Sequence, residues 1–180
     1  MTHEGRDREL FRASSAPATT ATRDTGLLVL RLVVGLSMAG HGTMKLFGWF
    51  GGPGLTATGK GFSMAGYPAG DAMAVIAGLA ETLGGLGLAL GLLTPLAGAA
   101  MIGTFINVLG IRGLSAYFPP KGVELEVVLF AGVLALTLTG PGRCSVDHVL
   151  PVLRESRPRY SLLAVALGGV AGLVVLLMRD

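Results

Sequence analysis

Five long apolar stretches constrain the fold of this 180-residue chain more than any other feature. They cover Gly26–Gly48, Asp71–Leu93, Pro95–Ala116, Val123–Gly140 and Ser161–Met178. Each is long enough, at about 1.5 Å per residue, to cross most or all of the roughly 30 Å hydrocarbon core of a bilayer. Only 14% of the residues are charged, against roughly 25% in soluble domains. The pattern predicts an all-α, polytopic membrane helical bundle, with no length left for a second globular domain.

The sequence outside these stretches divides the chain into four parts. Residues 1–25 are polar, have no hydrophobic periodicity and are expected to form a disordered cytoplasmic tail. The first apolar run lacks the features of a cleaved signal peptide. Residues 26–150 contain the first four predicted helices, and 151–160 form a basic cytoplasmic linker. Residues 161–180 provide an additional transmembrane helix.

The distribution of basic residues predicts the orientation, because Lys and Arg concentrate in cytoplasmic loops. With the N-terminus in the cytoplasm, eight arginines lie on that side and four Lys or Arg residues lie outside. We therefore expect a multi-pass protein of the bacterial cytoplasmic (inner) membrane with a cytoplasmic N-terminus. The sequence pI of about 9.4 comes from basic residues at helix ends, so we expect no nucleic-acid partner.

Four polar residues from four predicted helices share one depth. Counted from the cytoplasmic end at 1.5 Å per residue, His41, Glu81, Asn107 and Glu126 each lie roughly 18–22 Å up. A carboxylate such as Glu81 costs about 2.5–3.5 kcal/mol inside the membrane on insertion scales. This cost favours a protein-facing position with partners. His41, Glu81 and Glu126 are therefore candidates for proton exchange.

Other polar and aromatic residues surround this layer. Lys45 follows His41 by four residues, on the same helical face, and could reach outward to the surface or down to a carboxylate. Arg31 is expected near the inner interface as an anchor for lipid phosphate. Trp49 belongs to the aromatic and glycine-rich string Phe47–Leu55, which either caps an outward-facing cavity or serves as an interface anchor and turn. Lys45, Asn107 and Trp49 are the candidate substrate-binding residues.

Two interpretations of the polar layer remain open at this level. Asn, His and Glu in membrane helices often serve as interhelical hydrogen-bonding residues worth less than about 2 kcal/mol. Asn107 fits that role well. Two neighbouring carboxylates would instead form a proton-holding pair. The sequence is compatible with either structural contacts or a functional site.

Several classes of chemistry lack the residues they need. Cys144 is the single cysteine, and His41 is the one histidine inside a predicted span. No metal-ligand spacing, nucleophile triad or phosphate loop is present, so we expect no metal site and no intrinsic cofactor. The redox-active atoms of any reaction would come from a substrate, a quinone or a partner protein.

Several strings resemble the DoxX family of bacterial four-helix membrane proteins. They are Arg31–Gly35, His41–Gly54 (HGTMKLFGWFGGPG), Ala80–Gly85, Leu90–Pro95 and Gly140–Arg143, within about residues 27–150. The resemblance implies a DoxX-like four-helix core, to which the fifth helix is added. It also implies an inner-membrane protein associated with oxidoreductase systems, including thiosulfate:quinone oxidoreduction and thiol or superoxide stress.

These observations lead to one main hypothesis and two alternatives. The main hypothesis is a membrane subunit of a quinone-linked or small-sulfur/thiol-linked redox system, with electrons from a partner subunit. The first alternative is a non-enzymatic scaffold or anchor in which the polar layer holds the helices together. The second is a small proton-coupled permease, which would require a homo-oligomer. The sequence identifies neither the substrate nor the partner, and leaves open whether the chain is catalytic.

Overall fold

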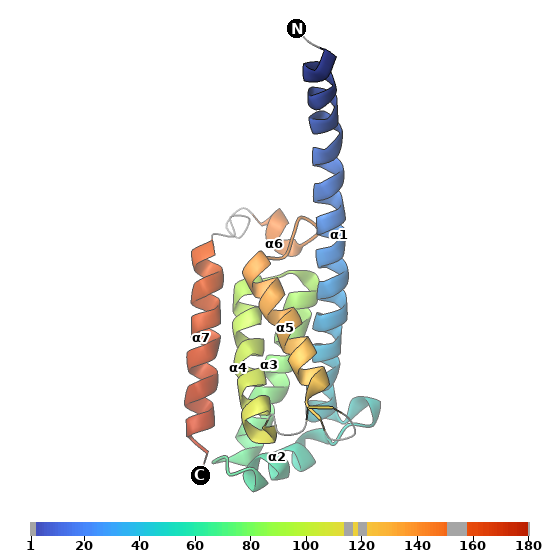
Figure 1. The fold of residues 1–180 in the computed structure, drawn as a ribbon. Coiled ribbons are helices and arrows are strands. Elements are labelled where there is room, and N and C mark those ends of the chain that lie inside the picture. Colours follow the sequence, from blue (N-terminus) through green and yellow to red (C-terminus); the bar gives the residue numbers. More distant parts are fainter. Residues whose placement is uncertain (1–2, 114–116, 119–121, 151–157, 180) are drawn as a thin grey trace.

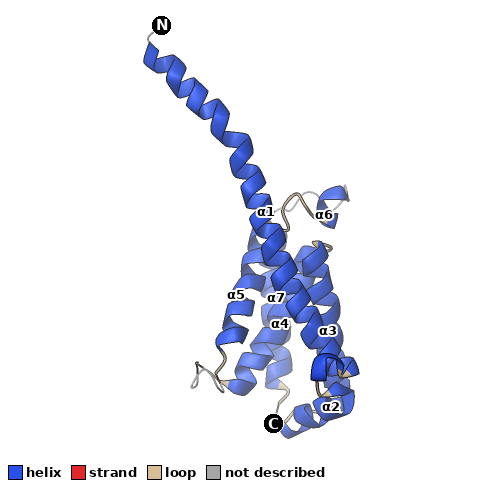
Figure 2. Cartoon of the chain, turned by 90° about the vertical axis from the view of Figure 1, so that its right-hand side faces the viewer, coloured by secondary structure: helices blue, strands red, loops and turns tan. Residues whose placement is uncertain are grey.

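The computed structural model of the chain describes residues 3–113, 117–118, 122–150 and 158–179. These residues are helical throughout apart from short turns, and no strand occurs among them (Figure 2). In chain order the elements are α1 (His3–Phe47), the 3₁₀ helix η1 (Trp49–Gly51), α2 (Gly54–Met64), α3 (Gly70–Leu90), α4 (Thr94–Arg112), α5 (Glu124–Thr139), α6 (Val146–Val149) and α7 (Pro158–Leu177). The predicted all-α membrane bundle is confirmed.

Helices α1, α3, α4, α5 and α7 run side by side along one direction, which we take as the bundle axis (Figure 1). The short α2 lies across one end of the bundle, and α6 lies at the other end. The N-terminus extends beyond the α6 end, whereas the C-terminus lies at the α2 end. The two ends of the chain therefore lie at opposite ends of the bundle.

Four helices in the described part of the chain are long and apolar enough to cross a membrane. They are the Thr20–Phe47 part of α1, α3, α4 and the Arg159–Leu177 part of α7. Five spans were expected from the sequence. The fourth of these, Val123–Gly140, folds as α5 with 16 residues, which is about 24 Å of helix. This length is shorter than a typical span of about 20 residues, although α5 packs against α1, α4 and α7.

The first helix begins at His3 rather than after a disordered tail. Its 45 residues correspond to about 67 Å, and its N-terminal part extends well past the other helices (Figures 1 and 2). A physical reason for the difference is that extending an existing helix costs far less than starting one. The Arg, Glu, Leu and Ala residues of this segment also favour helix.

Helices α1 and α3 approach each other closely because glycines face each other along their contact. A Cβ added at Gly35 would lie 2.6 Å from the carbonyl oxygen of Gly85, and one at Gly85 would lie 2.6 Å from that of Gly35. Nearer the α2 end, a Cβ at Gly42 would lie 2.7 Å from the carbonyl oxygen of Gly78. A side chain at Gly35, Gly42 or Gly85 would meet the backbone of the other helix, so the two helices are in backbone contact.

The fifth long helix, α7, packs against α4 through small residues. A Cβ at Gly172 would lie 2.8 Å from the Cα of Gly103, and a Cβ at Gly168 would lie 3.0 Å from the Cα of Ala99. Ala164 is buried on the same face. The opposite face exposes large apolar side chains such as Leu163 and Leu167, as expected for contact with lipid. The predicted extra helix therefore belongs to the bundle.

Candidate functional site

An ion pair between α1 and α3 lies at the centre of the candidate site. The ammonium group of Lys45 donates a hydrogen bond to Oε2 of Glu81. The Glu81 side chain is only 2% exposed, while Lys45 retains 25%. A buried carboxylate is tolerated when a cation both pairs with it and donates a hydrogen bond to it. The structure thus gives Glu81 the counter-ion that its position requires.

The local folding of both helices produces this pairing. Lys45 lies in the last turn of α1, which ends at Phe47 before Gly48 adopts a left-handed conformation. Glu81 lies in the middle of α3, three residues beyond Gly78, and Gly78 allows α1 to approach. A lysine side chain can therefore extend from the end of one helix along its neighbour to a carboxylate deeper in the bundle.

The ion pair faces a cavity of about 220 Å³. Its walls come from α1, α2, α3, α4 and α7, and most of the lining is apolar, for example Ile76, Val108 and Val175. Besides Lys45 and Glu81, the polar lining consists of Thr104 and Asn107. Protein pockets that bind small molecules have this composition, with apolar walls and a few polar groups that fix orientation.

The positions of the lining residues indicate where the cavity opens. Ile76 on α3 is 58% exposed, and Ala171 on α7 is also exposed, yet both line the cavity. Both residues lie on spanning helices whose outer faces carry exposed leucines and valines. The cavity is therefore accessible between α3 and α7, from the side that a bilayer covers.

Asn107 joins three parts of the fold. Its amide nitrogen donates to the carbonyl oxygens of Gly103 (3.0 Å) and Gly172 (2.9 Å). Its amide oxygen accepts a 2.7 Å hydrogen bond from the hydroxyl of Tyr67, in the connection between α2 and α3. Both amide hydrogens and the amide oxygen are thus engaged, so Asn107 serves mainly to hold α7 and the Tyr67 segment to α4.

Burial also affects Tyr67, which lies outside the spanning helices. Removal of the phenol from solvent raises its pKa above the usual value, and the smaller attraction of Arg179 acts in the opposite direction. The phenol is therefore neutral at ordinary pH and remains available as the hydrogen-bond donor to Asn107.

Glu126 pairs with Arg112 and makes no contact with Glu81 within the described part of the chain. It lies in the first turn of α5 and accepts a hydrogen bond from Arg112, in the last turn of α4. Among the described residues, no hydrogen bond or ion pair connects Glu126 with Glu81, Lys45 or His41. Counting depth from Gly140 overlooked a basic residue at the adjoining helix end, which pairs with Glu126 near the end of the bundle.

Two further predicted site residues lie apart from the cavity. His41 is half-buried on α1, and no hydrogen bond to its ring occurs within the described part of the chain. It does not line the cavity that contains Lys45 and Glu81. Trp49 is 57% exposed and packs against Phe47 and Phe50. Its position agrees with an interface anchor rather than with a substrate contact.

Arg31 has a different environment from the predicted lipid anchor. Its side chain is 1% exposed, and its guanidinium donates to the carbonyl oxygens of Pro141 (2.6 Å) and Cys144. Asp147 lies close enough to stabilise its charge. Asp147 in turn accepts hydrogen bonds from the backbone N–H groups of Leu93 (2.7 Å) and Thr94 (2.9 Å). These contacts tie α1, the α3–α4 turn and the segment after α5 together at the α6 end.

One comparison with known proteins found a match. The model of the DoxX family matches residues 26–111. The chain carries a DoxX domain. The match includes both residues of the ion pair, Lys45 and Glu81, whereas α5, α6 and α7 lie beyond it. No curated protein and no solved structure matches the chain. The DoxX assignment and the apolar helices together make this a multi-pass membrane protein.

Proposed function

We propose that this DoxX protein is a membrane subunit of a redox system and binds a quinone headgroup in the cavity beside Lys45 and Glu81. One observation carries the proposal. An ion pair with a buried carboxylate faces a mostly apolar cavity that is accessible from the bilayer side, between α3 and α7. Such access suits a membrane-soluble substrate better than a small sulfur species dissolved in water.

The size and the chemistry of the cavity fit a quinone headgroup. At about 220 Å³ it is smaller than the roughly 300–1,000 Å³ of pockets for drug-sized ligands. It would accommodate one substituted ring, with the isoprenoid tail leaving between α3 and α7 into lipid. A quinone is an acceptor of two electrons and two protons.

The roles of the two charged residues follow from their chemistry. Lys45 would donate a hydrogen bond to a quinone carbonyl oxygen and so favour negative charge there. Glu81 would hold a proton for transfer, because its carboxylate can take up a proton when the hydrogen bond from Lys45 is released. Thr104 lines the same cavity, and its hydroxyl oxygen can accept a hydrogen bond. We propose that the electrons come from a partner protein.

Substitution of Glu81 tests this function. Glu81→Gln retains the shape and a hydrogen-bond acceptor for Lys45 but cannot carry a proton. We expect quinone reduction in membranes containing the partner system to fall by roughly 10²–10⁴-fold, the usual contribution of a positioned proton carrier. Glu124→Gln is the matched control, because Glu124 does not line the cavity. Full turnover in the Glu81→Gln protein, with the protein folded, would rule out a proton-carrying role.

A partner-holding role is a second candidate, supported by the length of α1. Its N-terminal part extends past the bundle (Figure 1), where a peripheral protein could bind it. We propose that deletion of residues 1–19 would lower quinone reduction in membranes while leaving quinone binding by the purified chain intact. Loss of quinone binding by the same deletion would argue against this separation of roles.

A further inference from the structure

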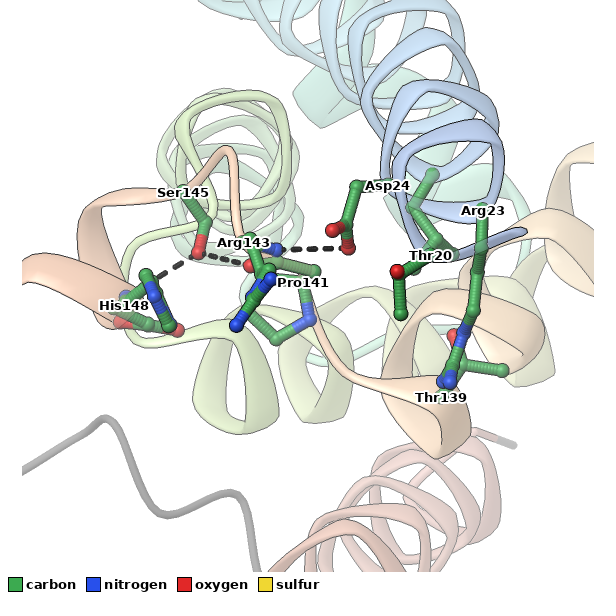
Figure 3. A pocket seen from close by; sticks show the side chains of 11 residues that line it. Thr20, Arg23, Asp24, Thr139, Pro141, Arg143, Ser145 and His148 are labelled. Carbon is green, nitrogen blue, oxygen red and sulfur yellow. Dashed lines mark hydrogen bonds between the residues drawn. The ribbon is translucent and has the colours of Figure 1, made fainter. Parts of the chain in front are cut away.

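A second cavity lies at the opposite end of the bundle from Lys45. It measures about 340 Å³ and is formed by the start of the membrane-spanning part of α1, the end of α5 and the segment through α6 (Figure 3). Leu27 and Thr139 belong to its walls, near the ends of the spanning helices. The cavity therefore lies at the level where lipid headgroups begin.

Basic side chains from separate segments line this cavity. Arg23 comes from α1, Arg143 from the segment after α5, and His148 from α6 (Figure 3). Within the described part of the chain, the guanidinium groups of Arg23 and Arg143 have no hydrogen-bond acceptor. Guanidinium groups are the preferred donors for bidentate recognition of phosphate.

The two acidic residues of the cavity accept hydrogen bonds from backbone N–H groups and not from the two guanidinium groups. Oδ1 of Asp24 accepts the backbone N–H of Arg143 at 3.1 Å. Both carboxylate oxygens of Asp147 accept backbone N–H groups of the α3–α4 turn, and its charge is compensated by the buried Arg31. With Arg31 included, the arginines of this region outnumber its carboxylates by three to two. The cavity thus retains two guanidinium groups available to an anion.

We propose that this cavity binds a phosphate-type oxyanion through Arg23 and Arg143, with His148 as an additional donor. Two sources share this chemistry, namely the headgroup of an anionic phospholipid and free inorganic phosphate. The position at the membrane surface makes both accessible. The site is independent of the quinone cavity, and its failure would leave the proposed function unaffected.

The experiment uses the full chain purified in mild detergent. Native mass spectrometry with an equal mixture of phosphatidylglycerol and phosphatidylcholine tests the lipid source. Calorimetric titration with inorganic phosphate in phosphatidylcholine nanodiscs tests the free anion. We expect the wild-type chain either to bind phosphatidylglycerol in preference to phosphatidylcholine or to bind inorganic phosphate. Arg23→Gln/Arg143→Gln should weaken that binding by roughly tenfold or more.

The controls separate anion binding from loss of fold. Arg143 bonds Asp24 through its backbone N–H, so substitution of its side chain leaves that bond in place. Arg23→Lys/Arg143→Lys should recover much of the binding, since charge is retained. Arg159→Gln removes an arginine outside the cavity and should bind as the wild type does. Equal binding by the wild-type and Gln proteins, or no binding of either probe by the wild type, would overturn the proposal.

Discussion

Lys45 Nζ donates a hydrogen bond to Oε2 of Glu81, and this carboxylate is almost completely removed from solvent. The pair joins the end of α1 to the middle of α3 at the wall of an apolar cavity. Removal of one member of such a pair leaves an uncompensated buried charge, whereas removal of both does not. The stability loss on removing one residue or both therefore distinguishes a pair of compensating charges from an incidental contact.

We expect Lys45→Met to destabilise the protein by about 3–5 kcal/mol, because Glu81 would lose its counter-ion. Thermal unfolding in detergent measures the loss. Adding Glu81→Gln to Lys45→Met should recover a large part of it, since a neutral amide costs less to bury than a carboxylate. Lys60→Met is the control, because Lys60 is exposed on α2 and should change stability little. Strictly additive losses in the double variant would contradict this pairing.

The sequence predicts that Glu81 has a partner, but it does not predict that Glu126 pairs elsewhere. The cost of a carboxylate in an apolar helix predicts a partner for Glu81, and Lys45, on the same helical face as His41, could reach either outward or down to a carboxylate. Depth counting compares heights alone and ignores which residues end the neighbouring helices. Because α5 has 16 residues, Glu126 falls in its first turn, near Arg112. Attention to basic residues at adjoining helix ends would have identified that pair.

The α4–α7 contact gives a second prediction. Gly172→Ala should destabilise the packing by about 1–3 kcal/mol, because the added Cβ would meet the backbone of Gly103 at 2.8 Å. Gly169→Ala is a matched control on the same helix, since nothing lies within 4 Å of a Cβ there. Disulfide cross-linking between cysteines introduced into α4 and α7 reports the separation. Equal cross-linking in both variants would show that α7 does not depend on this contact.

A third prediction concerns the contacts of Asp147. In Asp147→Asn a single amide oxygen replaces two acceptors, so one of the N–H groups of Leu93 and Thr94 loses its partner. We expect a loss of about 1–3 kcal/mol in thermal unfolding. Asp24→Asn should cost less, because Asp24 accepts one N–H group and the amide oxygen can still accept it. A larger effect of Asp24→Asn would contradict the assignment.

Tyr67 gives a prediction on pH. Burial raises its pKa in the folded state, whereas an unfolded tyrosine titrates near 10. Above about pH 10 the unfolded state therefore binds fewer protons than the folded state, and stability falls as pH rises. Tyr67→Phe should remove this part of the decline. Below about pH 10 it should lower the free energy of unfolding by about 1 kcal/mol, because the hydrogen bond to Asn107 is lost. Tyr160→Phe, at an exposed site, should keep the decline.

The contacts of Arg31 show what could not be predicted from the sequence. An arginine near the end of an apolar stretch usually extends to lipid phosphate. Here its acceptors are the backbone carbonyls of Pro141 and Cys144, more than a hundred residues further along the chain. Carbonyl acceptors carry no residue-type signal, so only the fold reveals them. The all-α membrane bundle, by contrast, follows directly from the apolar stretches, and the structure confirms it.

The central proposal is that the cavity beside Lys45 and Glu81 binds a quinone headgroup. The most direct measurement is equilibrium binding of a short-chain quinone to the purified chain in nanodiscs, compared with Ala77→Leu and Ala166→Leu. Ala77 lines the cavity, while Ala166 lies exposed on α7. We predict saturable binding by the wild-type and Ala166→Leu proteins and its loss in Ala77→Leu. Equal binding by all three proteins, or no saturable binding by the wild type, would contradict the proposal.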